Sequence, residues 1–358
     1  MKPMKAAIDT LIKTAHRPVA ALRGWLPWGS GESNRHPRVK AERPVEAFDI
    51  RDRPTIGVAL SSGGAKGLAH IGVIQVLEES GIEVDAIAGT SMGAYVAAMW
   101  ASGLNGEELE ELAATVQDRG DLFSLVDPVF FPRRGFIQGR KIERRLRVTL
   151  GDRSFREMVK PLYILATEFE GFRRRVLHEG DVASAVLASI AIPGIVVPVT
   201  RDGIEYVDGG VCDPLPVGVL REMAGVDHII AVNVLPTVEE FHLSRQNRPD
   251  CPELPLWKRP FCWLNRQVNW FARGNILDTL RSAAMASQMQ VVEHSAQLAD
   301  VSIRPVDPSA RWHDYTSFRR YIDIGREAAQ NALPEILAFS GGQAPPQTSE
   351  TESKEALN

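Results

Sequence analysis

The pattern of apolar residues from residue 55 onward predicts two consecutive strand–turn–helix units. In the first, an apolar strand at 55–62 leads through the glycine-rich turn GGAKG into a helix at 68–81, where apolar residues recur every three or four positions. In the second, a short strand at 84–88 leads through GTSMG into a helix of small residues at 94–103. Two such units in succession indicate an α/β domain.

Short apolar runs later in the chain predict five more strands, with helices between several of them. These strands cover residues 162–168, 173–179, 204–207, 228–234 and 301–305. Because strands and helices alternate along the chain, we expect a largely parallel sheet that is covered by helices on both faces.

The two ends of the chain differ from this central region. In residues 1–50, apolar positions with helical spacing lie among lysines and arginines, two tryptophans follow, and a stretch of linker composition completes the segment. This pattern fits an interfacial amphipathic helix attracted to anionic lipid, or equally a helix that docks on its own domain and breaks at Pro18. Residues 341–358 predict a disordered tail, which leaves 51–340 as the folded domain.

Composition and charge exclude several classes of partner and compartment. The formal net charge of -4 provides no general attraction for nucleic acid. The three cysteines form neither a CxxC pair nor a metal-ligand spacing, so we expect no disulfide framework and no zinc site. The N-terminus lacks a secretory signal pattern, and no apolar run approaches the ~20 residues of a spanning helix. We therefore expect a cytoplasmic protein, either soluble or peripheral on the inner membrane.

Ser91 lies in the sequence GTSMG, which fits the pattern Gly-x-Ser-x-Gly. In this pattern the serine occupies a strained turn between a strand and a helix, and Gly89 and Gly93 allow the backbone to approach closely. The hydroxyl is then exposed above the sheet, beside the amino terminus of the following helix. Because GTSMG lies between an apolar strand and a small-residue helix, we predict that Ser91 is a nucleophile, with an ordinary tight turn as the alternative.

The second glycine-rich loop, SGGAKG at residues 62–67, can turn backbone N–H groups outward at the start of a helix. Such a loop binds phosphate or stabilises an oxyanion. A phosphate loop is disfavoured because Ser62 replaces the first glycine of Gly-x-Gly-x-x-Gly and Lys66 is followed by glycine. A dinucleotide site stays open, since Glu83 and Asp85 lie about 20 residues further on, as a ribose ligand would. An oxyanion hole beside a nucleophilic serine explains both glycine loops.

A nucleophilic serine also needs a proton acceptor. Four histidines follow it, but none lies in a glycine-rich turn at a strand end that would fix its ring. They are His228, His242, His294 and His313. Asp208 ends a predicted strand and precedes two glycines, so its carboxylate can lie at the carboxyl edge of the sheet. A buried and oriented carboxylate can act directly as a general base, whereas the alternative for Asp208 is an Asx turn.

Taken together, these motifs make residues 54–335 resemble the patatin-like phospholipases, a family of acyl-ester hydrolases with a Ser–Asp dyad. The resemblance depends on the order of GGAKG, GTSMG, ASIAIPGIVVPV at 188–199 and DGG at 208–210. It implies a three-layer α/β/α fold around a mainly parallel central sheet, with Ser91 as nucleophile and Asp208 as base. It also implies phospholipase A or lysophospholipase activity on a lipid ester, with no metal and no cofactor.

The same resemblance assigns the oxyanion hole to the backbone N–H groups of Gly63, Gly64 and Ala65. Lys66 occupies a position where the family usually carries arginine or lysine. There are two alternative functions: an acyltransferase that uses the same acyl-enzyme, and a catalytically silent membrane adaptor. Nothing in the sequence bears on the oligomeric state.

Two positions depart from the family pattern. Ser62 stands where many members have glycine, and because it lies at the edge of the loop we expect little effect. Asp213 stands where asparagine is common. It is either a turn residue before Pro214, the interpretation that we prefer, or a like charge that raises the pKa of Asp208.

Two internal segments suggest contact with a membrane. Residues 236–275 interleave aromatic and basic side chains, a mixture that fits a membrane-contacting lid or an ordinary packed subdomain. Residues 139–148 place lysine and arginine on one side of a predicted helix. This side is either a solvated face or a contact for anionic headgroups.

Overall fold

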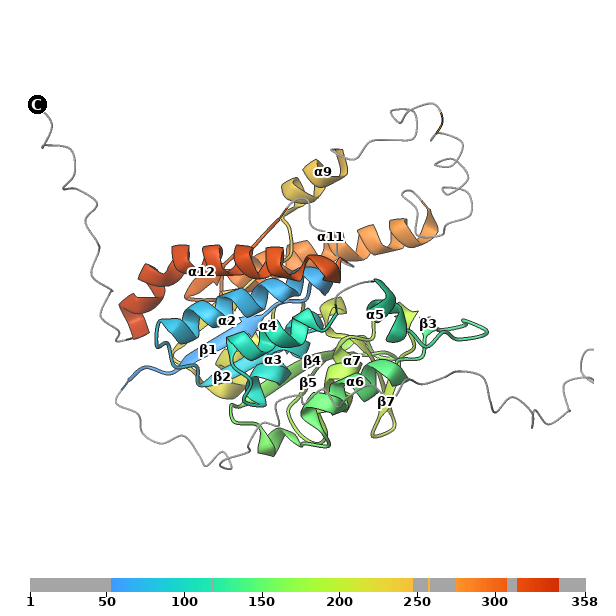
Figure 1. Cartoon of the computed structure of the whole chain (residues 1–358), viewed down its shortest axis with the longest axis horizontal. Coiled ribbons are helices and arrows are strands. Elements are labelled where there is room, and N and C mark those ends of the chain that lie inside the picture. Colours follow the sequence, from blue (N-terminus) through green and yellow to red (C-terminus); the bar gives the residue numbers. More distant parts are fainter. Residues whose placement is uncertain (1–52, 117–118, 247–256, 258–274, 308–313, 341–358) are drawn as a thin grey trace, which may run out of the picture. The chain divides into compact units, whose positions relative to one another are not determined.

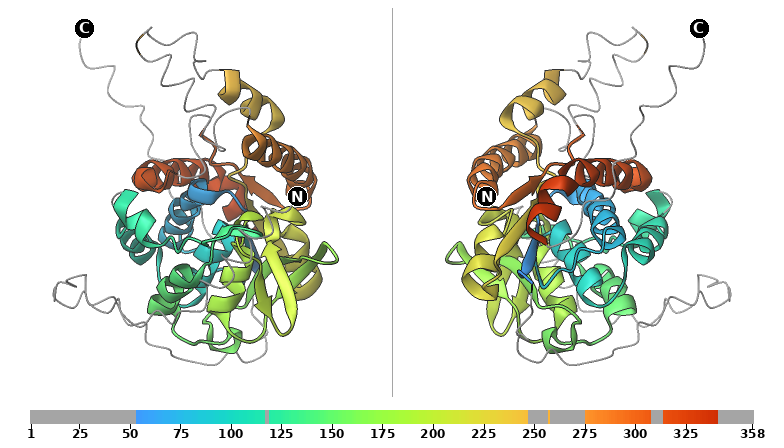
Figure 2. Two further views of the ribbon diagram at one scale, coloured as in Figure 1. Left: turned by 90° about the vertical axis from the view of Figure 1, so that its right-hand side faces the viewer. Right: turned by 90° about the vertical axis from the view of Figure 1, so that its left-hand side faces the viewer.

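The computed structural model describes residues 53–116, 119–246, 257, 275–307 and 314–340. The predicted segment 1–50, most of the predicted lid at 236–275 and the predicted tail at 341–358 lie outside these residues. The described part forms a central sheet with helices on both of its faces, so the expected three-layer α/β/α fold is confirmed (Figures 1 and 2).

The central sheet has eight strands in the order β10-β9-β1-β2-β4-β8-β7, and β5 pairs with β4 outside this path. Strands β10, β9, β1, β2 and β4 run parallel, whereas β5, β8 and β7 join through antiparallel pairs. Strands β3 and β6 form a separate parallel pair. The strands are β1 (Ile56–Leu60), β2 (Ala86–Thr90), β3 (Gly135–Ile137), β4 (Leu162–Glu168), β5 (Arg173–Leu177), β6 (Gly194–Val196), β7 (Val199–Arg201), β8 (Ile204–Asp208), β9 (His228–Val232) and β10 (Val301–Ile303).

All strands expected from the sequence are present, and the sheet is largely parallel, as expected, with an antiparallel end that the sequence analysis did not specify. Only residues 169–172 separate β4 from β5, and only Asp202 and Gly203 separate β7 from β8. Connections this short join antiparallel strands, because parallel strands need a longer crossover. Asp202 and Gly203 have φ of 51° and 79°, as the tight turns of hairpins require.

Ten helices and several short helical turns are described. The α-helices are α2 (Ala69–Glu79), α3 (Met92–Ala101), α4 (Gly106–Ala114), α5 (Arg119–Ser124), α6 (Arg140–Leu150), α7 (Val182–Ser189), α8 (Val217–Val219), α9 (Val238–Gln246), α11 (Ile276–Ala296) and α12 (Phe318–Ser340). The shorter elements are the 3-10 turns η1 (Gly64–Leu68), η2 (Phe155–Glu157), η3 (Gly209–Val211) and η6 (Tyr315–Ser317) and the π-helical turn η4 (Leu220–Ala224). Within the described residues, no helix is long and apolar enough to span a membrane.

The two faces of the sheet pack into two separate hydrophobic cores. Val58 and Ile87 pack in a core that also contains residues of α2, α3, α7 and α12, whereas their neighbours Ala59 and Ala88 pack against residues of α8, η4 and α11. Successive side chains of a strand point to opposite faces, so one strand serves both cores. Figure 2 shows α12 and α11 on opposite sides of the strands.

Helices α2 and α12 approach closely because each has a glycine at the crossing point (Figure 1). A Cβ atom at Gly72 would lie 2.0 Å from the carbonyl oxygen of Ile322, and one at Gly325 would lie 2.0 Å from that of Ala69. Since α2 follows directly from the GGAKG loop, α12 supports the helix that extends from this loop.

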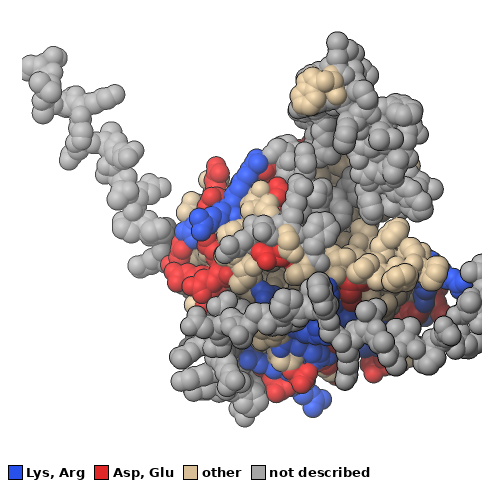
Figure 3. Space-filling view, turned by 45° about the vertical axis from the view of Figure 1, so that its right-hand side comes forward, with Lys and Arg blue, Asp and Glu red and all other residues tan. Residues whose placement is uncertain are grey.

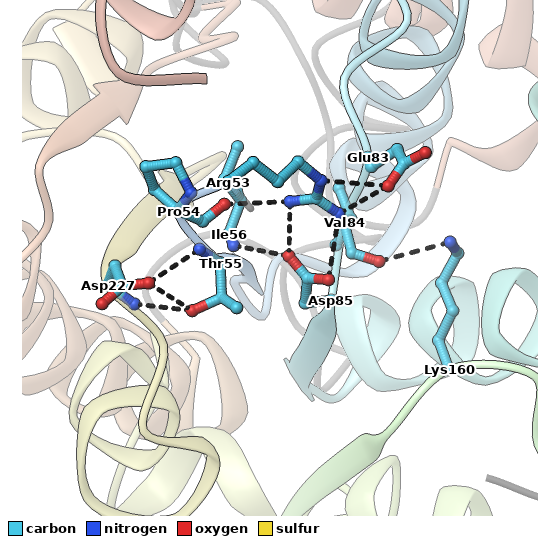
Figure 4. Close-up of polar contacts among 9 residues, drawn as sticks. All are labelled: Arg53, Pro54, Thr55, Ile56, Glu83, Val84, Asp85, Lys160 and Asp227. Carbon is cyan, nitrogen blue, oxygen red and sulfur yellow. Dashed lines mark hydrogen bonds and ion pairs between the residues drawn. The ribbon is translucent and has the colours of Figure 1, made fainter. Parts of the chain in front are cut away.

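A polar cluster fastens the amino-terminal ends of β1 and β2 (Figure 4). The Arg53 guanidinium forms ion pairs with Glu83, at 2.6 Å, and with Asp85, at 2.9 Å. Asp85 also accepts a hydrogen bond from the N–H of Ile56 at 2.8 Å, and Asp227 accepts one from the N–H of Thr55. These contacts fix the edge of the sheet opposite to the turn that holds Ser91.

Candidate active site

Ser91 occupies the turn between β2 and α3 in a conformation that few non-glycine residues adopt. Its φ and ψ are 55° and -118°. Backbone atoms crowd both flanking glycines: a Cβ atom at Gly89 would lie 2.5 Å from the Gly93 carbonyl oxygen, and one at Gly93 would lie 2.2 Å from that of Leu60. The turn therefore has the backbone geometry expected for an elbow of this kind, in which strain and close approach hold the serine at the end of the strand.

The Ser91 hydroxyl donates a hydrogen bond of 2.6 Å to Oδ2 of Asp208, and both residues are 6% exposed. The other carboxylate oxygen of Asp208, Oδ1, accepts from the N–H of Gly210 at 2.7 Å. Burial raises the pKa of Asp208 to about 6, and the hydrogen bonds from Ser91 and Gly210 lower it only in part. A carboxylate with this pKa is ionised near neutral pH yet basic enough to accept a proton.

Asp208 reaches Ser91 from an antiparallel strand. Strand β8 overlaps β4 only through its last residues, where Asp208 lies opposite Ala166, while Thr90 on the other side of β4 lies opposite Leu165. The carboxyl end of β8 is thus level with the carboxyl end of β2. The backbone at Gly209 then passes so close to β4 that a Cβ atom added there would lie 2.2 Å from the Leu165 carbonyl oxygen.

The glycine loop SGGAKG lies beside both motifs. The N–H of Ser62 donates to the carbonyl of Pro214 at 2.8 Å, and a Cβ atom at Gly67 would lie 2.4 Å from Cγ of Met92, the residue after Ser91. The turn η1 begins at Gly64, and no side chain caps it at Gly63. The first N–H groups of a helical turn have no acceptor within that turn, so this end provides donors for an anionic oxygen.

Comparison with known proteins finds similarity to one family in the part of the chain that carries this arrangement. A family profile described as "Patatin-like phospholipase" matches residues 58–221, a span that contains the glycine loop, the elbow and the DGG turn. Over these residues the chain is similar to the patatin-like phospholipase family.

Individual relatives have lysophospholipase and NTE names. An uncharacterized NTE family protein of Mycobacterium bovis is 34% identical over 215 residues, which are 60% of this chain and 56% of that protein. Patatin-like phospholipase domain-containing protein 6 of Homo sapiens is 27% identical over 276 residues, 76% of this chain and 20% of that protein. Lysophospholipase nte1 of Aspergillus fumigatus is 32% identical over 180 residues, 50% of this chain and 12% of that protein. The chain thus spans little more than half of the first of these relatives and a much smaller share of the other two.

The dinucleotide alternative for the glycine loop is wrong. A ribose ligand would have to lie near the glycine loop, at the carboxyl end of the strands. Glu83 and Asp85 instead precede β2, at the amino-terminal edge of the sheet, where both carboxylates bind Arg53. Five residues of strand, or about 17 Å, separate that edge from Ser91.

Asp213 makes the contacts of a turn residue. Its carboxylate accepts from Arg174 at 3.3 Å and its carbonyl oxygen accepts from the Thr90 hydroxyl at 2.8 Å. Burial raises the pKa of Asp213 to about 6, against the lowering effect of Arg174. These contacts, with Arg174 and Thr90, agree with the preferred turn interpretation.

The other departure from the family pattern, Ser62, lies closer to the site than expected. Its hydroxyl is buried and has no hydrogen-bond partner among the described residues. A Cβ atom at Gly210 would lie 3.2 Å from this hydroxyl and 3.0 Å from Oδ1 of Asp208. Ser62 therefore lines the turn that holds the carboxylate.

Two histidines of the described residues, His228 and His70, have other contacts, whereas His313 lies outside the described residues. His228 stacks on Phe339 with ring centroids 4.4 Å apart and lies 3.6 Å from the Asp300 carboxylate. His70, which the sequence analysis did not consider, is fully buried in α2, and its Nε2 lies 2.9 Å from the carbonyl oxygen of Ser61. Burial lowers the pKa of His70 to about 4, so its ring is neutral. It supports the strand end before the glycine loop.

Ser189 is the site residue that the sequence analysis missed. Its hydroxyl accepts the N–H of Ser91 at 2.9 Å and donates to the carbonyl of Leu165 at 2.6 Å, and it is fully buried. It thereby ties the strained elbow to β4. The residue lies in the segment ASIAIPGIVVPV, whose place among the family motifs was the signal that could have drawn attention to it.

Proposed function

We propose that this chain is a serine lipid hydrolase in which Ser91 is the nucleophile and Asp208 the general base. The observation that carries the proposal is the 2.6 Å hydrogen bond from the Ser91 hydroxyl to the Asp208 carboxylate, at an elbow with positive φ. The raised pKa of Asp208, about 6, supports it because a base of this strength can accept the serine proton near neutral pH.

In the proposed acylation, the Ser91 oxygen attacks the ester carbonyl as Oδ2 of Asp208 accepts its proton. The negative charge that develops on the carbonyl oxygen is stabilised by backbone N–H groups of Gly63, Gly64 and Ala65, each good donor contributing about 3 kcal/mol. The tetrahedral intermediate collapses, the ester C–O bond breaks, and protonated Asp208 returns the proton to the departing alcohol. The fatty acyl group is then bound to Ser91.

Deacylation uses the same groups in reverse order. Water attacks the acyl-enzyme carbonyl while Asp208 accepts a proton from the water molecule. The bond to Ser91 breaks, Ser91 regains a proton from Asp208, and fatty acid is released. Each group returns to its starting protonation state, so the cycle consumes only ester and water.

We propose phospholipids or lysophospholipids as the substrate class. Support comes from the family match and from the names of relatives, one of which is a lysophospholipase. An acyltransferase would share the acyl-enzyme and differ only in the acceptor. A silent adaptor would have no need for a buried Ser–Asp hydrogen bond at an elbow.

The test combines covalent labelling with product analysis. A fluorophosphonate probe should label the wild-type protein and fail to label Ser91→Ala, and Asp208→Asn should lose turnover. Fatty acid release from a panel of phospholipids, lysophospholipids and neutral glycerides then identifies the substrate, with Ser91→Ala as control. Full activity of Asp208→Asn would exclude the dyad, transesterified product would indicate a transferase, and absence of labelling and turnover would favour the adaptor.

A further inference from the structure

Most of the segments that the sequence suggested for membrane contact lie outside the described residues, and α6 has other contacts. Lys141 donates to the carbonyl of Val126 at 3.0 Å, and Arg145 donates to the Thr115 hydroxyl. Among the three basic residues on this side of α6, only Arg144 is exposed and has no such hydrogen bond among the described residues. Two loops on which the sequence analysis did not comment have a stronger pattern of exposed side chains.

The first loop connects α5 to β3 and projects beyond the helices around it (Figure 1). Its aromatic residues Phe130 and Phe131 are 96% and 82% exposed, and their ring centroids are 6.4 Å apart. Two adjacent phenylalanines with this exposure cost free energy in water, since burying a Phe side chain contributes about 1.5–3 kcal/mol. Exposed apolar residues gathered in this way mark a binding surface.

The second loop is the turn between β4 and β5, where Phe172 is 66% exposed and has a φ of 47°. Its ring lies 6.3 Å from that of Phe169, and the guanidinium of Arg134, at the base of the first loop, lies 5.2 Å above the Phe169 ring. The two loops are therefore joined by a continuous series of contacts, although they are far apart in the sequence.

The first loop, and the second loop together with the start of β5, carry an excess of positive charge. Residues 128–134 and 169–175 contain five arginines and a single acidic residue, Glu170. Three of the arginines have ion pairs with glutamate or aspartate of neighbouring segments, and these are Arg134, Arg174 and Arg175. Arg133 and Arg173 are exposed and have no ion pair among the described residues. In Figure 3 the largest group of acidic side chains lies at the left, whereas uncharged residues form a continuous area at the right.

The second loop also touches the turn that follows the candidate base. The Cys212 thiol donates to the carbonyl of Phe172 at 3.2 Å, and Val211, beside the DGG turn, is 44% exposed. The second loop thus contacts a residue only four positions after Asp208 in the chain.

We propose that Phe130, Phe131, Arg133, Phe172 and Arg173, here called the aromatic–arginine rim, bind an anionic lipid surface. The phenylalanines would enter the boundary between headgroups and acyl chains, while the two arginines contact phosphate. A lipid surface fits better than a protein groove because the aromatic residues lie in loops, and a cation without an ion pair among the described residues lies in the first loop (Arg133) and directly after the second (Arg173). This inference rests on the proposed function, for which the rim would place the dyad next to lipid esters.

The test uses the whole chain with the substitution Ser91→Ala, so that lipid is not consumed. Binding is measured by sedimentation of the protein with vesicles of phosphatidylcholine, with or without phosphatidylglycerol. Replacing Phe130 and Phe131 with alanine should weaken binding at least tenfold. Arg133→Gln and Arg173→Gln should each weaken binding to anionic vesicles about fivefold. Val148→Ala and Leu298→Ala are matched controls, because these residues are 52% and 48% exposed but lie outside the rim. Wild-type binding by the rim variants overturns the inference.

Activity measurements separate this inference from the proposed function. Rim variants that retain Ser91 should hydrolyse a soluble short-chain ester at the wild-type rate, but should hydrolyse vesicle lipid more slowly than the wild-type protein does. Vesicle binding that depends on the rim in a protein without any esterase activity would support the rim and refute the hydrolase. Normal hydrolysis of vesicle lipid by the rim variants would leave the hydrolase intact and refute the rim.

Discussion

Asp208 combines burial, which raises its pKa, with hydrogen bonds from Ser91 and Gly210, which lower it. Burial is the larger effect, and the resulting pKa of about 6 is the property that suits a carboxylate to act without a histidine. Ser189 provides the second contribution at this scale, because its hydroxyl satisfies the backbone N–H of a serine held at positive φ. Single hydrogen bonds thus fix both partners of the candidate dyad.

The acid limb of the pH–rate profile should report this pKa. As the pH falls through about 6, Asp208 becomes protonated and can no longer accept the serine proton, so kcat/KM should drop roughly tenfold per pH unit below that point and level off above it. The measurement is kcat/KM on a soluble short-chain ester. In the control Asp213→Asn the limb should stay in place, because Asp213 binds Arg174 rather than Ser91. A limb near the ordinary aspartate value of about 3.9 would contradict the assignment.

Ser189→Ala should lower kcat more than it changes KM. The substitution leaves the Ser91 N–H and the Leu165 carbonyl without their buried partner, which costs about 1–3 kcal/mol and loosens the elbow. We expect a fall in kcat of at least tenfold. Ser102→Ala is the control, since Ser102 is a buried serine whose hydroxyl donates to Met99 away from the dyad. If both variants lose stability but keep kcat, Ser189 is purely structural.

At the scale of elements, close contacts between glycines and backbone decide how the helices support the loops. Helix α2 begins directly after η1, and α12 rests on it through Gly72 and Gly325. The same principle holds at the elbow, where Gly89 and Gly93 allow α3 to begin against β1. Methyl groups at such positions would have to displace backbone, which yields less readily than a side chain.

Gly72→Ala should destabilise the fold by roughly 3 kcal/mol, because the added Cβ atom would lie 2.0 Å from the Ile322 carbonyl oxygen and would push α12 away from α2. Urea denaturation measures the loss. Gly81→Ala is the control: its φ of 68° is unfavourable for alanine, but no atom lies within 4 Å of the new Cβ, so about 1 kcal/mol is expected. Equal losses would show that strain at the helix contact is not the cause.

At the scale of the whole described domain, the two edges of the parallel strands have different tasks. The amino-terminal edge is fastened by Arg53, Asp85 and Asp227, and the carboxyl edge carries the elbow, the glycine loop and the DGG turn. Substitutions at the first edge should therefore affect stability without affecting the chemistry.

Asp85→Ala should lower the free energy of unfolding by about 3 kcal/mol, since it removes a buried partner of Arg53 and the acceptor for the Ile56 N–H. Glu83→Ala removes the exposed partner of the same arginine and should cost at most about 1 kcal/mol. Both folded variants should keep wild-type kcat/KM on a soluble ester. A loss of kcat/KM in Asp85→Ala at temperatures where this variant is fully folded would instead link the Arg53 cluster to the candidate active site.

Much of the fold could be predicted, and the main candidate site residues could be selected, because their signals are local. Strands such as Leu162–Glu168, the helix after the glycine loop and the GTSMG turn each depend on a few neighbouring residues whose spacing or backbone needs are visible in the sequence. Ser189, His70 and the Arg53 cluster were missed, because buried polar residues of this kind acquire a role only from partners that are distant in the chain.

The sequence by itself determined the local elements, the elbow and the choice of Ser91 and Asp208 as candidates. Only the tertiary structure decided that β8 runs antiparallel to β4 and overlaps it at Asp208, which brings together two residues 117 positions apart. It also decided that Ser189 holds the elbow and that Asp85 lies at the opposite edge. Local patterns follow from spacing along the chain, whereas strand order, strand direction and burial depend on which distant segments pack together.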